Sequence, residues 1–259
     1  MQDLRAALIQ SDLAWEEIDA NISNFDCKIN SIGEKTDIIL LPEMFTTGFT
    51  MNAERVSQGM DGSAVAWMKK KSAETNAHIT GSLIIQDGGN FYNRLIWAMP
   101  GGKIHTYDKK HLFRYAGEDA TYTPGTAGIT VEIKGWRIRP FICYDLRFPL
   151  WTRNMNNQYD AALFIASWPE SRSLHWKSLL AARAIENQCY VIGVNRVGTD
   201  GNGIRYSGDS AVINYRGEVM YISHDNETIH TFTLSHGELA DYRKNFPFWK
   251  DADVDMLKL

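Results

Sequence analysis

Apolar residues along the chain follow two patterns, stripes with helical spacing and short continuous runs. The first stripe has spacings of three and four residues and consists of Trp15, Ile18, Ile22, Phe25, Ile29 and Ile32. This spacing predicts a helix that ends near Gly33, since glycine is favoured just past a helix C-terminus. Residues 37–41 form an apolar run that stops at Pro42. Such a run predicts a strand buried on both faces of its sheet.

The same two patterns predict the remaining elements. Strands are expected at residues 4–10, 78–86, 91–98, 103–108, 129–133, 137–143, 159–167, 190–195, 206–214, 218–222 and 228–234. Helices are expected at residues 63–75, 174–188 and 239–244. The second of these helices places Leu179, Ala182 and Ile185 on one side. No Pro/Gly/Ser-rich linker divides the chain, so we expect one domain over residues 1–259, with 246–259 as a C-terminal tail.

Two segments repeat a similar order of residues. In each, an apolar strand leads to a Pro-Glu pair, in residues 36–43 and in residues 159–170. This echo predicts an α/β protein with two related halves, each containing a strand–helix–strand unit. Two sheets would then pack face to face beneath outer helices.

Composition and charge exclude several classes of protein. Apolar residues make up 44% and charged residues 22% of the 259-residue chain, which allows a packed core. A net charge of −4 and a pI near 6.0 argue against a nucleic-acid-binding protein with a basic face. The apolar runs are too short to cross a membrane, and the N-terminus does not read as a signal peptide. Three cysteines cannot form a closed set of disulfides, so we expect reduced thiols and a cytoplasmic location.

Three of the expected strands lead abruptly to an ionisable residue, which is where rigid scaffolds present reactive groups. Glu43 follows the first of them, directly after Pro42. Because proline fixes its own backbone angle and ends the strand, Glu43 sits at a stiff boundary. Taken alone, however, a glutamate in such a place is usually a solvated loop residue.

The second strand leads into residues 107–113, with the sequence YDKKHLF. A run of charges here is commonly the edge of a sheet. Strand alternation puts Tyr107, Lys109 and His111 on one face. Lys110 lies on the opposite face, so only one of the two lysines can face a site.

The third strand ends at Cys143, which is followed by Asp145 and Arg147. Free cysteine is usually a small buried hydrophobic residue, and Cys27 and Cys189 are interpreted in that way. A thiol nucleophile needs nearby positive charge, a base and hydrogen-bond donors for an oxyanion. No histidine has a persuasive context for the base, but a lysine and a glutamate can supply the charge and move the proton.

These residues lie in motifs that strongly resemble those of the nitrilase superfamily of carbon–nitrogen hydrolases. The motifs occur in order, as LPEMF at 41–45, YDKKHLF at 107–113 and CYDLRFP at 143–149. Three further segments resemble bacterial omega-amidases, which act on 2-oxoglutaramate or 2-oxosuccinamate, at 167–188, 195–203 and 208–210. The resemblance covers essentially the whole chain. It implies a four-layer αββα sandwich of two mixed sheets that dimerises through its outer helices.

The resemblance implies that Glu43, Lys109 and Cys143 form a catalytic triad, and it selects Lys109 over Lys110. The family often carries a second glutamate about six residues before a Pro-Gly pair. Glu118 precedes residues 124–125 by that spacing, which implies that it positions Lys109 and the substrate amide. The neighbouring Asp119 is the alternative.

The resemblance also implies a reaction in which a small amide is the substrate. Cys143 attacks the amide carbon, Glu43 takes the thiol proton and later protonates the departing nitrogen, and a thioester remains until water releases the acid. The Lys109 ammonium and the backbone N–H of Tyr144 hold the oxyanion. This chemistry needs no metal or organic cofactor, and the sequence contains no HExxH motif or paired-cysteine ligand spacing.

Arg172 is the candidate to bind a substrate carboxylate, with Trp168 as an apolar wall, because a guanidinium binds a carboxylate through two parallel hydrogen bonds. Arg147 is the alternative, unless it braces its own loop through Asp145. Three other functions are considered. These are a relative acting on nitriles, N-carbamoyl groups or other amides, a non-catalytic member of the same fold, and a Cys–His peptidase.

Overall fold

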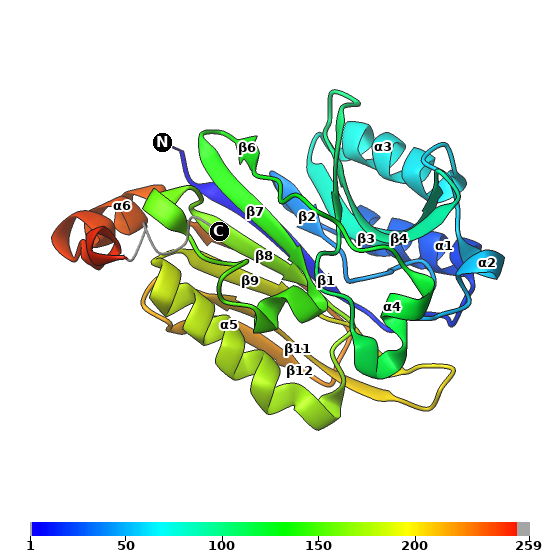
Figure 1. The fold of residues 1–259 in the computed structure, drawn as a ribbon. Helices are drawn as coiled ribbons and strands as arrows, with labels where there is room; N and C mark the ends of the chain where they lie inside the picture. Colours follow the sequence, from blue (N-terminus) through cyan, green and yellow to red (C-terminus); the bar gives the residue numbers. More distant parts are fainter. Residues whose placement is uncertain (1, 253–259) are drawn as a thin grey trace.

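The strands form two mixed sheets that lie face to face in the computed structural model, which describes residues 2–252 (Figure 1). The first sheet has the order β13-β1-β2-β3-β4-β5, with bounds β1 Leu4–Gln10, β2 Ile38–Leu40, β3 His78–Asp87, β4 Asn90–Ala98, β5 Ile104–Asp108 and β13 Thr228–Leu234. The second has the order β10-β11-β9-β8-β7-β6, with β12 paired to β11. Its bounds are β6 Val131–Ile133, β7 Trp136–Ile142, β8 Ala161–Ile165, β9 Tyr190–Val194, β10 Val197–Thr199, β11 Arg205–Ile213 and β12 Val219–His224.

Helices cover the outer face of each sheet. Helices α1 (Ile18–Asn30) and α3 (Ser63–Thr75) lie on the first sheet, and α5 (Ser173–Asn187) lies on the second (Figure 1). The shorter helices are α2 (Ala53–Val56), α4 (Glu118–Thr121), α6 (His236–Asn245) and the 3₁₀ turns η1 (Arg114–Ala116), η2 (Cys143–Arg147), η3 (Met155–Asn157), η4 (Glu170–Arg172) and η5 (Phe248–Asp251). The predicted αββα sandwich is confirmed.

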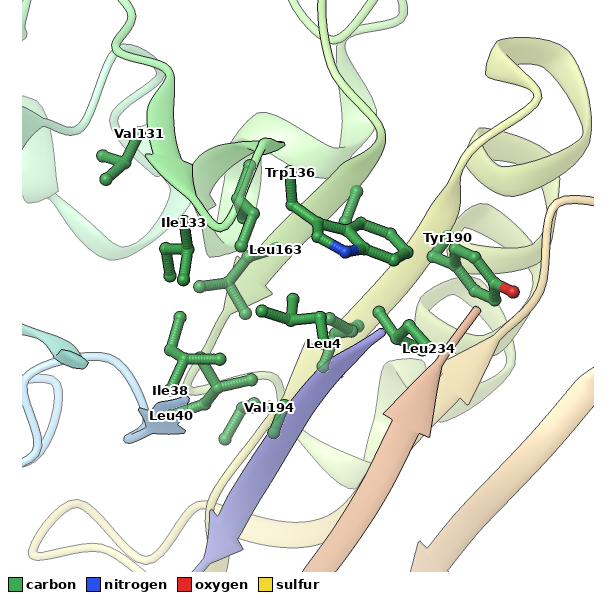
Figure 2. Close-up of a cluster of buried hydrophobic side chains, with 14 of the residues drawn as sticks. Leu4, Ile38, Leu40, Val131, Ile133, Trp136, Leu163, Tyr190, Val194 and Leu234 are labelled. Carbon is green, nitrogen blue, oxygen red and sulfur yellow. The ribbon is translucent and has the colours of Figure 1, made fainter. Parts of the chain in front are cut away.

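Strand alternation explains why the sheets are buried on both faces. In β1, Leu4 points between the two sheets, where it meets Leu163 of β8 (Figure 2). Leu8 of β1 and Ile192 of β9 belong to the same buried cluster. Ala7 and Ile9 of β1 point outward and pack against α1 and α3. A separate apolar layer fills the space between the second sheet and α5. Three stacked apolar layers therefore support the strand ends that carry the site.

The repeated segments of the sequence occupy equivalent places in the two sheets. Strand β2 runs parallel to β1 and β3, and strand β8 runs parallel to β7 and β9. Antiparallel strands complete each sheet at its edges. The chain leaves β2 toward Glu43, β7 toward Cys143, and β8 toward Ser167. Parallel strands bring their carboxyl ends to the same edge of a sheet, which places the ends of β7 and β8 together. The end of β2 meets them from the first sheet, where Glu43 accepts a hydrogen bond from the Ser167 N–H.

Several predicted boundaries were wrong. Helix α1 begins at Ile18 rather than Trp15. Its C-terminal cap is Ser31, so the residue just past the cap is Ile32 rather than Gly33, because the helix ends before the apolar stripe does. Helix α5 buries Trp176, Leu180 and Ala184. Ile185, on the side that the sequence marked as apolar, is 51% exposed.

The C-terminal part of the described chain contains η5 and ends at residue 252. Residues 253–259 of the predicted tail lie outside the described residues. Within residues 2–252, no helix is long and apolar enough to span a bilayer.

Candidate active site

Glu43 is a fully buried carboxylate, not the solvated loop residue that its type alone would suggest. The backbone continues from β2 along β3, where the Leu41 N–H donates to the Thr80 carbonyl. The Glu43 side chain then turns inward. Its Oε1 accepts a hydrogen bond from Asn93 Nδ2 at 2.7 Å, and its Oε2 accepts one from the Ser167 backbone N–H at 2.8 Å. These donors hold the carboxylate in one orientation.

Lys109 is buried between two carboxylates. Strand β5 ends at Asp108, so the predicted strand face shared by Lys109 and His111 does not exist. Lys109 Nζ lies 2.9 Å from Glu43 Oε1 and 2.9 Å from both carboxylate oxygens of Glu118. Lys110, by contrast, places its Nζ over the Trp151 ring at 5.5 Å. The structure thus brings Lys109, and not Lys110, to the carboxylate predicted to be its partner.

Glu118 completes this charged cluster from the first turn of α4. It is fully buried, and one of its oxygens also accepts a hydrogen bond from the Phe113 backbone N–H. The alternative, Asp119, faces Arg114 on the surface at 3.5 Å. Of the two acidic neighbours, Glu118 is therefore the one beside Lys109.

Cys143 stands on a tight turn where β7 passes into η2. Its φ of 43° lies in the left-handed region, which a non-glycine residue adopts only when the surroundings hold it there. Asp145 supplies much of that support. Its carboxylate accepts hydrogen bonds from the Ile142 N–H at 3.0 Å and from the Tyr107 hydroxyl at 2.6 Å, and it pairs with His111 Nδ1 at 2.8 Å. The turn that carries the thiol is thereby tied to the segment that carries Lys109.

The protonation states follow from burial and from these neighbours. Burial raises the pKa of the Cys143 thiol well above its usual value, and Glu43 raises it further by charge repulsion and hydrogen bonding, while Lys109 opposes the shift. Burial alone would lower the pKa of Lys109, but the charges of Glu118 and Glu43 raise it overall. The resting site therefore holds a neutral thiol and an ammonium. Attack by the sulfur consequently requires a base that takes the thiol proton.

The pKa of Glu118 is raised, chiefly by burial and also by the charge of Glu43, with Lys109 acting in the opposite direction. Cys189 has a pKa raised to about 12, again mainly by burial, and Cys27 is exposed on α1. Neither cysteine lines the cavity described below. Cys143 is thus the cysteine that the fold places beside a lysine and a glutamate.

A cavity of about 480 Å³ opens beside the thiol. Its wall includes Lys109, Cys143, Tyr144, Trp168 and Arg172. Glu43 lies behind this wall, in contact with Lys109 and Ser167. Trp15, which the sequence placed in a helix, instead precedes α1 and lines the cavity.

Both candidate arginines reach the cavity wall. The Arg172 guanidinium lies 5.3 Å from the centre of the Phe113 ring, and the Arg172 carbonyl accepts a hydrogen bond from Trp168 Nε1. Arg147 lies 4.8 Å from the Trp168 ring centre and contacts His175 Nδ1 at 3.1 Å. The prediction that Arg147 might brace its loop through Asp145 was wrong, because Tyr107 and His111 occupy that carboxylate.

Two contributors to the site were missed from the sequence. Asn93 donates to Glu43 from the middle of β4. The sequence feature that could have indicated it is a polar amide side chain within a strand whose last residues are apolar. Asn195 holds the segment after β8, because its Oδ1 accepts from the Trp168 N–H and its Nδ2 donates to the Trp168 carbonyl. Within residues 2–252, no group of three or more His, Cys, Asp or Glu side chains is arranged to hold a metal ion.

Residues 5–244 match the family model for carbon–nitrogen hydrolases. This chain belongs to the carbon–nitrogen hydrolase family. The predicted resemblance to the nitrilase superfamily is confirmed, and with it the assignment to hydrolases that act on carbon–nitrogen bonds other than peptide bonds.

Individual members of the family share most of their length with this chain. Omega-amidase YafV of Escherichia coli is 48% identical over 98% of both chains. The 2-oxoglutaramate amidase of Bacillus subtilis is 32% identical over 96% of this chain and 97% of its own length. Among solved structures, a CN-hydrolase superfamily protein of Xanthomonas campestris, which carries an arsenic adduct in its active site, is 42% identical. It superposes with a TM-score of 0.96 over 98% of each chain.

Proposed function

We propose that this carbon–nitrogen hydrolase is an omega-amidase, which cleaves the terminal amide of small 2-oxo acid amides such as 2-oxoglutaramate and 2-oxosuccinamate to the acid and ammonia. The observation that carries the reaction type is the buried Lys109 ammonium between Glu43 and Glu118, beside the Cys143 thiol at the cavity wall. The similarity to an omega-amidase over nearly the whole of both chains supports the substrate class.

In this mechanism Glu43 takes the proton from the neutral thiol as Cys143 attacks the amide carbon. The new oxyanion is held by the Lys109 ammonium, which lines the cavity, and by the backbone N–H of Tyr144. Glu43 returns the proton to nitrogen, the carbon–nitrogen bond breaks, and ammonia leaves a thioester on Cys143. Glu43 then activates a water molecule that releases the acid. Glu118 keeps Lys109 charged and in place.

The carboxylate of the substrate would bind to Arg172 or Arg147. Trp168, which contacts both arginines, would form the apolar wall beside it. Both guanidinium groups are braced by aromatic rings, which reduces the entropy lost when they bind an anion. A cavity lined by two arginines favours a charged oxo-acid amide over a neutral aliphatic amide or nitrile.

A substrate panel tests this proposal. Purified protein should release ammonia from 2-oxoglutaramate with a kcat/KM at least about a hundredfold above that for propionamide, an aliphatic nitrile or an N-carbamoyl amino acid. Propionamide and the nitrile lack the carboxylate, and the N-carbamoyl amino acid carries a ureido group in place of the amide. Coupled ammonia detection gives each rate. Preference for the nitrile or the N-carbamoyl compound would favour another activity of the same superfamily.

The two arginines can be separated by substitution. Arg147→Gln or Arg172→Gln should raise the KM for 2-oxoglutaramate by about ten- to a hundredfold, the usual effect of losing a hydrogen bond to a charged group. The kcat/KM for propionamide, which lacks a carboxylate, serves as the control and should change little. If a variant loses activity equally toward both substrates, the arginine it replaces does not bind the substrate carboxylate.

We further propose that the protein is a homodimer. Large apolar side chains lie exposed on neighbouring parts of the second sheet and its helix, namely Leu174 and Ile185 of α5 and Val219, Met220 and Ile222 of β12. Exposed apolar surface of this kind is typical of protein interfaces.

All three cysteines are unpaired thiols, which supports function in a reducing cytoplasm.

A further inference from the structure

Asn93 contacts all three charged residues of the site, the two glutamates through its side chain and Lys109 through its backbone, without carrying a charge itself. It lies in β4 and is 1% exposed. Its Nδ2 donates to Glu43 Oε1 at 2.7 Å and reaches Glu118 Oε1 at 3.4 Å. Its backbone carbonyl accepts the Lys109 N–H at 3.0 Å. One residue on a rigid strand therefore contacts the proposed base, its lysine and the second glutamate.

The charges in this cluster do not balance. Two buried carboxylates, Glu43 and Glu118, face a single ammonium, so one negative charge lacks a cationic partner within the cluster. A second cation would compensate it but would also compete with Lys109 for Glu43. An amide N–H stabilises a carboxylate by hydrogen bonding and adds no charge. Asn93 thus holds the Glu43 carboxylate in place while Lys109 stays available to the substrate.

The orientation of the Asn93 amide is fixed at a cost to folding. Its Oδ1 is buried and has no hydrogen-bond partner among the described residues. The reverse orientation would direct that oxygen at the Glu43 carboxylate, which is repulsive. An unpaired buried acceptor is destabilising, so an apolar residue of the same size would suit the packing of β4 better. The Asn93 amide therefore destabilises the fold through its unpaired oxygen, while its N–H group binds the carboxylates.

We propose that Asn93 is a positioning residue that keeps the Glu43 carboxylate directed at the Cys143 thiol, so that Glu43 can accept the thiol proton. This inference rests on the proposed thioester mechanism, in which Glu43 is the base. It does not depend on which amide is the substrate.

Asn93→Leu tests the inference, because leucine has a similar volume and no donor. We expect kcat on the best amide substrate to fall by about ten- to a hundredfold, with a smaller change in KM. The larger effect on kcat separates a loss of orientation at Glu43 from a loss of substrate binding. Steady-state rates over a range of substrate concentrations give both quantities.

Thr80→Val is the matched control. Thr80 lies in the neighbouring strand β3, and its buried Oγ1 likewise has no partner among the described residues. This variant removes a buried polar atom from the same sheet without touching the charged cluster, so kcat and the alkylation rate of Cys143 should remain those of the wild-type protein. Asn93→Ser keeps a hydroxyl donor and should retain more activity than Asn93→Leu. It also replaces Asn93→Leu if that variant does not fold.

Alkylation of Cys143 by iodoacetamide, followed by intact-mass measurement, tests the same point without substrate turnover. In Asn93→Leu the rate at pH 7 should fall by about tenfold, because Glu43 is no longer held in the orientation from which it takes the thiol proton. If the wild-type protein hydrolyses no amide, the proposed function fails while this measurement still decides the role of Asn93. A wild-type kcat and alkylation rate in Asn93→Leu, or a loss of thermal stability with unchanged kinetics, would overturn the inference.

Discussion

Replacing Cys143 with alanine should reduce amide hydrolysis by on the order of a million-fold, which is below detection in a standard assay. The variant retains the Lys109 cluster and the cavity but has no atom that can form the thioester. Ammonia release measures turnover, and intact-mass spectrometry during turnover measures the acyl adduct. The wild-type protein should show an adduct on Cys143, and the variant should show none.

Cys27→Ala is the control for this experiment, because Cys27 is an exposed thiol on α1, on the outer side of the first sheet. Its kcat and its adduct should equal those of the wild-type protein. Residual turnover of Cys143→Ala above about one percent, or an adduct that persists in it, would show that another group is the nucleophile.

The sequence predicted those residues of the site that directly follow a buried strand. Buried strands in a two-sheet α/β fold have nearly continuous apolar sequences, so an ionisable residue at the end of such a run is conspicuous. Glu43 and Cys143 could be singled out in this way, and family motifs separated Lys109 from Lys110. Strand alternation alone did not give the right reason for that choice, because β5 ends before Lys109 is reached.

Contacts between distant segments could not be predicted in the same way. Asp145 was linked in sequence to Arg147, only two residues away, but in the structure it binds Tyr107 and His111 from another sheet. Asn93 had no local signal strong enough to connect it with Glu43, fifty residues earlier. Such pairings depend on how the two sheets pack, which hydrophobic periodicity does not specify.

The buried face of helix α5 could not be predicted from the sequence either. Ile185 has an apolar side chain at a helical position, which predicts burial, yet it lies on the exposed side of α5. Trp176 and Leu180 form the buried side instead. A helix that is apolar on two sides gives no unique buried face from sequence, and the second side is consistent with the proposed dimer.

Lys109→Met should remove both activity and a large part of the stability of the fold. Methionine approximates the length of the lysine side chain but leaves Glu43 and Glu118 buried without their cation. Breaking a buried ion pair from one side costs roughly 3–5 kcal/mol of unfolding free energy. The loss should be smaller at pH 5 than at pH 8, because Glu118, whose pKa is already raised by burial, binds a proton more readily once the opposing charge of Lys109 is gone. Chemical denaturation at both pH values measures this difference.

The double variant Lys109→Met/Glu118→Gln separates the structural role of the cluster from its catalytic role. Neutralising Glu118 removes one of the two stranded charges, so we expect it to recover part of the lost unfolding free energy. Activity should stay at the level of Lys109→Met, because the ammonium that holds the oxyanion is still missing. Lys110→Met is the control, since Lys110 lies outside the carboxylate cluster and its Nζ lies over Trp151; it should leave kcat within a factor of about two. If Lys109→Met kept normal kcat, or if the double variant recovered activity along with stability, Lys109 would serve the fold and not the reaction.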